Sequence, residues 1–199
     1  MAEQVILPAF PAPLRRLGAR AAPTVEGEDA LTLTAGPGTD LFADPGGPDR
    51  FANAPALVSR LPGDLTLSAR VTLDLAATYD AGVLLVHAGD DAWAKLCVEL
   101  SPQRRPTIVS VVTRGVSDDA NGFTVESGDV WLRVARIGAA YAFHASTDGR
   151  FWHLVRYFAL DPGAEIGFLA QSPTGPGATV RFTGITVTRR TLTDLRGGT

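Results

Sequence analysis

Apolar and polar residues alternate with a period of two in short runs along most of the chain. From Leu65 to Leu73 the odd positions are apolar, and the even positions are Thr, Ser, Arg and Thr. Such alternation indicates a β-strand with one face in a core and the other in water. Helical periodicity is almost absent. The pattern therefore predicts an all-β protein.

Clusters of Gly, Pro, Asp and Asn separate these runs and are typical of turns. The predicted strands cover residues 31–35, 57–61, 65–73, 82–87, 93–100, 107–114, 130–136, 141–146, 152–158, 165–171 and 179–188. Some eleven or twelve strands in one unit indicate two antiparallel sheets packed face to face. Asp148-Gly149 predicts a two-residue hairpin, and Asn121-Gly122 predicts a turn inside a longer loop.

We expect the 199 residues to form a single domain. Its core would span about residues 26–188, with an N-terminal segment, 1–25, that wraps the edge of the sandwich and a short tail, 189–199. A chain of this length buries a core without disulfides, and the one cysteine, Cys97, has no intramolecular partner. An exposed sheet edge would be compatible with a homodimer.

The charge balance argues against a nucleic-acid partner. The formal net charge is −3, and seventeen arginines are scattered along the chain beside one lysine, Lys95. A nucleic-acid footprint would need clustered basic residues. Prolines interrupt the N-terminal apolar stretch, and no stretch approaches the roughly 18 apolar residues of a membrane span. We therefore expect a cytoplasmic protein without a signal peptide or membrane contact.

The predicted strand 93–100 carries the most informative side chains. Alternation puts its core residues, Ala94, Leu96, Val98 and Leu100, on one face, and the opposite face carries Trp93, Lys95, Cys97 and Glu99. On a convex surface this row would be an ordinary solvated face, whereas on a concave face it would form the floor of a cleft. The pattern leaves both interpretations open.

Lys95 and Glu99 would lie about 13 Å apart on an extended strand, so they cannot pair with each other. Each needs partners on neighbouring strands, and the candidates are Asp80, Asp118 and Arg156. His87, at the end of the preceding predicted strand, could reach the same cleft, although a strand-end histidine bonded to a loop is the commoner arrangement.

Other chemistries find little support in the sequence. The three histidines lack metal-ligand spacing, and Asp118, Asp119 and Asn121 lack the further oxygen ligands of a calcium loop, so we expect no metal. We interpret those three residues as a solvated acidic turn. Neither a nucleophile elbow nor a phosphate-binding loop is present, so we expect no cofactor.

A series of motifs between about residues 30 and 188 resembles the concanavalin A-like family of the regulation of enolase protein one, a domain of unknown function. The motifs include Thr39-Asp40-Leu41-Phe42, Tyr79-Asp80-Ala81-Gly82, Trp93-Ala94-Lys95 with Glu99, Ser117-Asp118, Ser146 with Asp148-Gly149 and Trp152, Arg156, and Gly167 with Ser172-Pro173. The resemblance implies a jelly-roll β-sandwich of two curved antiparallel sheets, with a concave face and no established activity.

Carried over from that family, the polar positions around the cleft fall on Trp93, Lys95, Glu99, Ser117, Asp118 and Arg156. The chain departs from the family where Asp119, Phe42 and Asp80 replace its usual Trp, Trp and Gln. Sugar-binding sites stack rings on flat aromatic side chains, so these departures remove stacking platforms from the predicted cleft.

Three functional hypotheses follow. The first is a module that binds a carbohydrate or other small polar ligand through Asp80, His87, Trp93, Lys95, Glu99, Asp118 and Arg156. The second is a glycoside-cleaving or related enzyme in which Glu99 works with a second carboxylate such as Asp80 or Asp118. The third is a structural or regulatory protein without a ligand. The absence of a Glu-x-Asp-x-Glu strand disfavours the enzyme.

Overall fold

The computed structural model describes residues 4–19 and 22–199. Within these ranges it contains sixteen strands and no helix. In chain order the strands are β1 (Arg15–Leu17), β2 (Thr24–Glu26), β3 (Ala30–Ala35), β4 (Leu41–Ala43), β5 (Arg50–Ala52), β6 (Ala56–Ser59), β7 (Leu65–Leu73), β8 (Ala81–Gly89), β9 (Ala92–Leu100), β10 (Pro106–Arg114), β11 (Val116–Thr124), β12 (Asp129–Ile137), β13 (Ala140–Ser146), β14 (His153–Ala159), β15 (Glu165–Gln171) and β16 (Ala178–Thr188).

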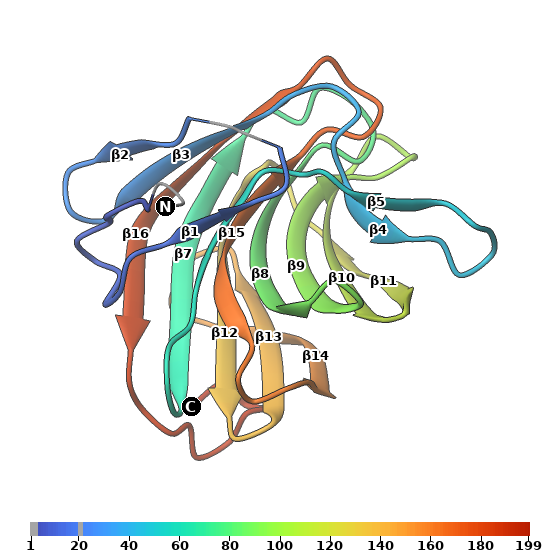
Figure 1. The fold of residues 1–199 in the computed structure, drawn as a ribbon. Helices are drawn as coiled ribbons and strands as arrows, with labels where there is room; N and C mark the ends of the chain where they lie inside the picture. Colours follow the sequence, from blue (N-terminus) through green and yellow to red (C-terminus); the bar gives the residue numbers. More distant parts are fainter. Residues whose placement is uncertain (1–3, 20–21) are drawn as a thin grey trace.

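The strands form two seven-stranded antiparallel sheets and a separate hairpin (Figure 1). The β9 sheet has the order β1-β6-β15-β8-β9-β10-β11, and the β7 sheet has the order β14-β13-β12-β7-β16-β3-β2. Hairpin β4–β5 lies beside β10 and β11, where the β9 sheet curves strongly (Figure 1). This is the predicted jelly-roll sandwich.

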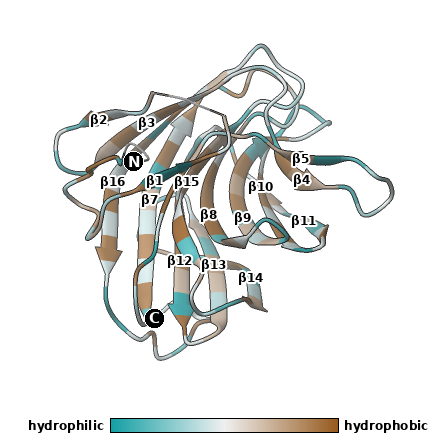
Figure 2. Cartoon of the chain, viewed as in Figure 1, coloured by the Kyte–Doolittle hydropathy of each residue, from teal (hydrophilic) through white to brown (hydrophobic). Residues whose placement is uncertain are grey.

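The main core lies between the two sheets. Leu84, Leu96 and Phe168 of the β9 sheet belong to one buried cluster with Leu67 and Phe182 of the β7 sheet. Strands β8, β9 and β10 are strongly apolar in Figure 2. These three strands lie inside their sheet rather than at its edges, and buried clusters cover both of their faces. Burial of alternating residues from two sheets is the dominant stabilising term in such a sandwich.

All eleven predicted strands are present, with ends that differ by a few residues. The sequence pattern missed the three-residue strands β1, β2, β4 and β5, and also the nine-residue strand β11. Three residues are too few to show alternation. β11 is a polar strand at the sheet edge, so it lacks the apolar face that identifies a strand.

Two turn predictions are therefore corrected. Asn121-Gly122 and the acidic residues before it lie within β11, and the register between β10 and β11 shifts between Thr107 and Val109. The β13–β14 connection is a six-residue loop, 147–152, rather than a two-residue turn. Asp148 Oδ1 accepts hydrogen bonds from the backbone N–H groups of Arg150 and Phe151, which shapes this longer loop.

The ends of the chain lie against the sheets. Of the predicted N-terminal wrap, residues 1–3 and 20–21 lie outside the described residues. Strand β1 is an edge strand of the β9 sheet, and β2 is an edge strand of the β7 sheet. In the C-terminal tail, buried Leu192 and Leu195 pack against Ala135 and Ala142 of the β7 sheet. No segment of the described chain forms a helix long and apolar enough to cross a membrane.

Candidate functional site

Strand β9 presents its polar row on the face of the β9 sheet that turns away from the main core. Trp93 and Cys97 belong to a second buried cluster on that outer face, whereas Ala94, Leu96 and Val98 belong to the core between the sheets. The predicted division of the strand is confirmed. In the sheet register, Lys95 lies opposite Leu85 of β8 and Val111 of β10, and Val111 lies opposite Asp119 of β11.

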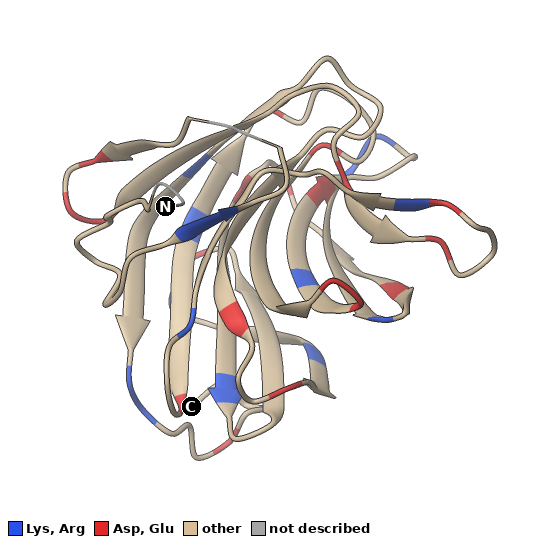
Figure 3. Ribbon diagram, in the orientation of Figure 1, with Lys and Arg blue, Asp and Glu red and all other residues tan. Residues whose placement is uncertain are grey.

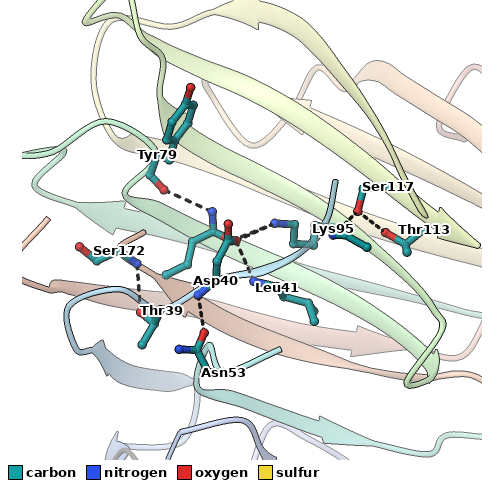
Figure 4. A network of polar contacts seen from close by, with 11 residues as sticks. Thr39, Asp40, Leu41, Asn53, Tyr79, Lys95, Thr113, Ser117 and Ser172 are labelled. Carbon is teal, nitrogen blue, oxygen red and sulfur yellow. Dashed lines mark hydrogen bonds and ion pairs between the residues drawn. The ribbon is translucent and has the colours of Figure 1, made fainter. Parts of the chain in front are cut away.

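A segment that ends with strand β4 crosses this outer face. Thr39 forms a β-bridge with Ser172, which follows β15. Four residues later, the backbone N–H of Ala43 donates to Ser117 Oγ of β11, 3.0 Å away. Between these anchors, Asp40 contacts Lys95 of the sheet below (Figure 4). The crossing segment, residues 39–43, separates two cavities.

The first cavity, the Lys95 pocket, has a volume of about 240 Å³. Its floor is formed by side chains of β9, β10 and β11, and its walls come from the crossing segment and the loop before β8. The lining residues are Asp40, Phe42, Tyr79, Lys95, Glu99, Val111, Asp119 and Gln171. The pocket therefore combines one ammonium group, three carboxyl groups, one amide and two aromatic rings.

Lys95 lies at the base of this pocket and is only 2% exposed. Its Nζ donates to Gln171 Oε1 at 3.0 Å and lies 3.4 Å from Asp40 Oδ1. Burial by itself lowers the pKa of a lysine, but the carboxylates around Lys95, Asp40 first among them, outweigh that effect and raise its pKa. Lys95 is therefore a charged, fixed hydrogen-bond donor.

Burial raises the pKa of two carboxyl groups of the pocket, Glu99 and Asp119. The pKa of Glu99 rises to about 7, and the Lys95 ammonium only partly offsets that rise. Near neutral pH, Glu99 thus exists in both its protonated and its ionised form, so it can donate or accept a hydrogen bond.

The second cavity, the Trp93 cavity, lies on the other side of the crossing segment and has a volume of about 330 Å³. It is lined by Leu17, Gly18, Leu41, Arg50, Ala52, Ala54, Ala56, Leu85, His87, Asp90, Trp93 and Leu169. The expectation that Trp93 and His87 share one cleft with Lys95 is wrong, because these two residues line the other cavity. Leu41 and Phe42 are neighbours in the sequence, yet each lines a different cavity.

His87 also has a local partner. Its Nδ1 lies 3.7 Å from Glu165, which accepts two hydrogen bonds from Arg15. Burial lowers the pKa of His87, although the nearby Glu165 carboxylate opposes this. Cys97 is completely buried on the same outer face, and burial raises the pKa of its thiol well above the usual value. The cysteine is therefore an unreactive packing residue.

Three further predicted site residues lie outside both cavities. Asp80 is buried, accepts hydrogen bonds from Ser172 Oγ at 2.7 Å and Ala77 N at 2.8 Å, and so positions the loop that carries Tyr79. Asp118 pairs with Arg156 of the other sheet at 2.7 Å. The prediction that these three residues are partners of Lys95 and Glu99 is wrong, because none of them lines the Lys95 pocket. Consecutive residues of a strand point to opposite faces, so Asp119 reaches the pocket and Asp118 does not.

The sequence interpretation missed six pocket residues: Asp40, Phe42, Tyr79, Val111, Asp119 and Gln171. Three of these residues lie within motifs that carried the family resemblance, which was the available signal. Their convergence depends on the crossing segment, which no local pattern indicates. Among the residues that the structure describes, no group of three or more His, Cys, Asp or Glu side chains is arranged to hold a metal ion.

A family model described as "Protein of unknown function (DUF1349)" matches residues 20–190 of this chain. The chain belongs to this family. The chain is 29% identical to Regulation of enolase protein 1 of Saccharomyces cerevisiae over 120 residues, which is 59% of this chain and 60% of the yeast protein. The match thus spans less than two thirds of that relative.

Solved structures place this DUF1349 member among β-sandwich proteins. A functionally unknown protein from Saccharomyces cerevisiae superposes with a TM-score of 0.82 at 23% identity, covering 90% of this chain and 97% of that one. The GH43 protein BlXynB of Bacillus licheniformis gives 0.67 at 16% identity, over 81% of this chain but 33% of its own. The carbohydrate-binding module CBM66 of Bacillus subtilis gives 0.53 at 15% identity, over 85% and 91%. These likenesses show the fold.

Proposed function

We propose that the Lys95 pocket binds a neutral, hydroxyl-bearing ligand with the size of one sugar ring. The observation that carries the proposal is the buried Lys95 ammonium, which is fixed by Asp40 and Gln171 at the base of a cavity on the outer sheet face. Removing a charged group from water costs several kcal/mol of desolvation free energy, which is offset only by well-placed ionic and hydrogen-bonding partners.

The remaining lining defines the class of ligand. Asp40, Glu99, Asp119 and Gln171 supply several acceptors for hydroxyl groups, and Phe42 and Tyr79 supply apolar surface for a ring. Three carboxyl groups against one ammonium disfavour an anionic ligand. The volume of about 240 Å³ lies below the usual range of about 300–1,000 Å³ for larger ligands, which favours a single ring.

The fold of CBM66, a carbohydrate-binding module, is compatible with this proposal. We infer a carbohydrate or cyclic polyol as the ligand class. The supporting contacts are those of the pocket itself, because at 15% identity no residue role is carried over.

The test is a calorimetric titration with a panel of neutral monosaccharides and cyclic polyols. Asp119→Asn and Glu99→Gln should weaken binding of the best ligand about 10-fold or more, because each alters an acceptor inside the pocket. Asp118→Asn is the matched control, since Asp118 is the adjacent residue but points away from the pocket and pairs with Arg156. A panel without any binder, or equal weakening by the Asp118 and Asp119 variants, would contradict the proposal.

A second candidate is glycoside cleavage, favoured by the pKa of Glu99 near 7. A carboxylic acid that is still partly protonated at neutral pH can serve as the general acid of a glycosidase, and Asp119 rather than Asp118 would be the second carboxylate. Hydrolysis of a chromogenic glycoside that disappears in Glu99→Gln while binding of the sugar persists would support the enzyme. Binding without hydrolysis would support the binding module.

A further inference from the structure

We propose that the Trp93 cavity is a second binding site, for uncharged and mainly apolar small molecules that carry a hydrogen-bond acceptor. This site is independent of the Lys95 pocket. The crossing segment lies between the two cavities, and no residue lines both of them.

The size and lining of the cavity define the apolar part of the ligand. A volume of about 330 Å³ falls within the usual range for small-molecule sites. Most lining side chains are aliphatic and come from the start of the chain, the hairpin and the sheet: Leu17, Leu41, Ala52, Ala54, Ala56, Leu85 and Leu169. The alanines leave the space that larger side chains would fill.

The Trp93 indole supplies the polar requirement. Trp93 is 1% exposed, and within the described part of the chain its Nε1–H finds no acceptor. Trp93 lines the cavity, and buried donors are nearly always paired in native proteins, so this unpaired donor points to an absent acceptor. A carbonyl or ether oxygen of a ligand would complete this hydrogen bond.

The Asp90 carboxylate in the lining disfavours an anionic ligand, and the other charges around the cavity are already paired. The Arg50 guanidinium lies over the Trp93 ring at 5.2 Å from its centre and is already paired with Asp91 at 2.6 Å. Near His87, the Glu165 carboxylate is held by Arg15. Neither arginine is therefore left to attract an anion, and the Glu165 carboxylate is not left to attract a cation.

Arg50 also sets the entry route. Trp93 Nε1 is shielded from water, so an acceptor reaches it only when the cover over the ring moves. The Arg50 side chain is 37% exposed, and it belongs to hairpin β4–β5 rather than to the sheet. We infer that displacement of this side chain admits the ligand.

The experiment uses the indole N–H signals of the intact protein. The chain has three tryptophans, so a ¹H–¹⁵N spectrum contains three indole cross-peaks, and Trp131→Phe and Trp152→Phe identify the one from Trp93 by elimination. Acetophenone, which has an apolar ring and one acceptor, should shift the Trp93 peak saturably and leave the other two unchanged. Ethylbenzene, with a similar shape and no acceptor, and the anion benzoate should produce at most a tenth of that shift at equal concentration.

Ala52→Phe provides the blocking variant, because Ala52 is an exposed residue that lines the cavity. It should abolish the acetophenone shift, whereas Ala159→Phe, at an exposed strand position outside the cavity, should preserve it. If Ala52→Phe fails to fold, Ala52→Leu serves the same purpose. No saturable shift in the wild type, an equal shift with ethylbenzene, or an unchanged shift in the folded blocking variant would overturn the proposal.

Discussion

The Nζ of Lys95 lies 3.4 Å from Asp40 Oδ1, although 55 positions separate the two residues in the chain. Lys95 belongs to the sheet, and Asp40 belongs to the segment that crosses its outer face. Asp40 in turn accepts a hydrogen bond from Leu41 N at 2.7 Å, and its backbone N–H donates to Asn53 Oδ1 at 2.9 Å (Figure 4). The ion pair thus fastens the hairpin region to the sheet and forms the base of the pocket.

Replacing Lys95 should destabilise the fold. In Lys95→Met, the carboxylate of Asp40 and the buried amide of Gln171 lose their cationic partner, so we expect the free energy of unfolding to fall by about 3 kcal/mol. Urea unfolding followed by fluorescence measures the change. Lys95→Met combined with Asp40→Asn should recover part of the loss, because no uncompensated charge remains. A loss below about 0.5 kcal/mol, as expected for the exposed control Arg105→Met, would show that the pair is energetically silent.

Glu99 should make the protein less stable as the pH rises from about 4.5 to about 7. Its pKa in the folded state is about 7 and its ordinary value is 4.5, so between these values the folded state binds more protons than the unfolded state. The penalty is complete above pH 7 and amounts to about 3 kcal/mol. Stability curves at pH 4.5 and 7.5 should show that Glu99→Gln removes this loss. The exposed control Glu28→Gln should retain it, and identical profiles for the two variants would refute the assignment.

His144 should have the opposite pH dependence. Burial, together with the nearby Arg133, lowers the pKa of His144 from 6.5 to about 4, so the unfolded state binds more protons between these values. Stability is therefore lost as the pH falls from about 6.5 to about 4, by about 3 kcal/mol. The C-terminal tail covers His144 through Leu195, so opening of the tail would hydrate the buried imidazolium and should be the first local change as the pH falls.

Hydrogen exchange of residues 192–198 as a function of pH tests this behaviour. His144→Gln keeps a side-chain donor for Leu195 but cannot become a cation in this range, so it should abolish the acid-dependent rise in exchange. Equal acid sensitivity in wild type and variant would assign the effect to another group.

Gly167 should not tolerate a side chain. A Cβ built on Gly167 would lie 1.9 Å from the Leu57 carbonyl oxygen of the neighbouring strand β6, and backbone in the middle of a sheet cannot withdraw. Gly167→Ala should lower the free energy of unfolding by about 3 kcal/mol or prevent folding altogether. Gly36→Ala is the control, because a Cβ added at Gly36 would meet no other atom within 4 Å. Thermal unfolding that is equal for both variants would contradict the prediction.

Blue and red segments are interspersed along the chain in Figure 3, although β1 carries only basic charges and β11 only acidic ones. This arrangement agrees with the scattered arginines of the sequence. The lining of the Lys95 pocket contains the one lysine of the chain and none of its seventeen arginines.

Local patterns determined the strands that carry an apolar face. The alternation in 65–73 and 93–100 has one physical origin. Consecutive side chains of a strand point to opposite faces of the sheet, and only one of these faces packs in the core between the sheets. The same rule assigned Lys95 and Glu99 to the face opposite Leu96 and Val98. The short strands and polar edge strand β11 escaped, because hydrogen bonding to neighbours defines them rather than hydrophobicity.

The sequence by itself determined the all-β class, eleven strands and the common face of Trp93, Lys95, Cys97 and Glu99. Only the tertiary structure decided what that face does. The crossing segment 39–43 brings Asp40 over Lys95 and separates Trp93 from Lys95 by placing Leu41 and Phe42 in different cavities. The physical reason is that strand periodicity fixes the direction of a side chain, whereas its partners depend on long-range packing between segments that are far apart in the chain.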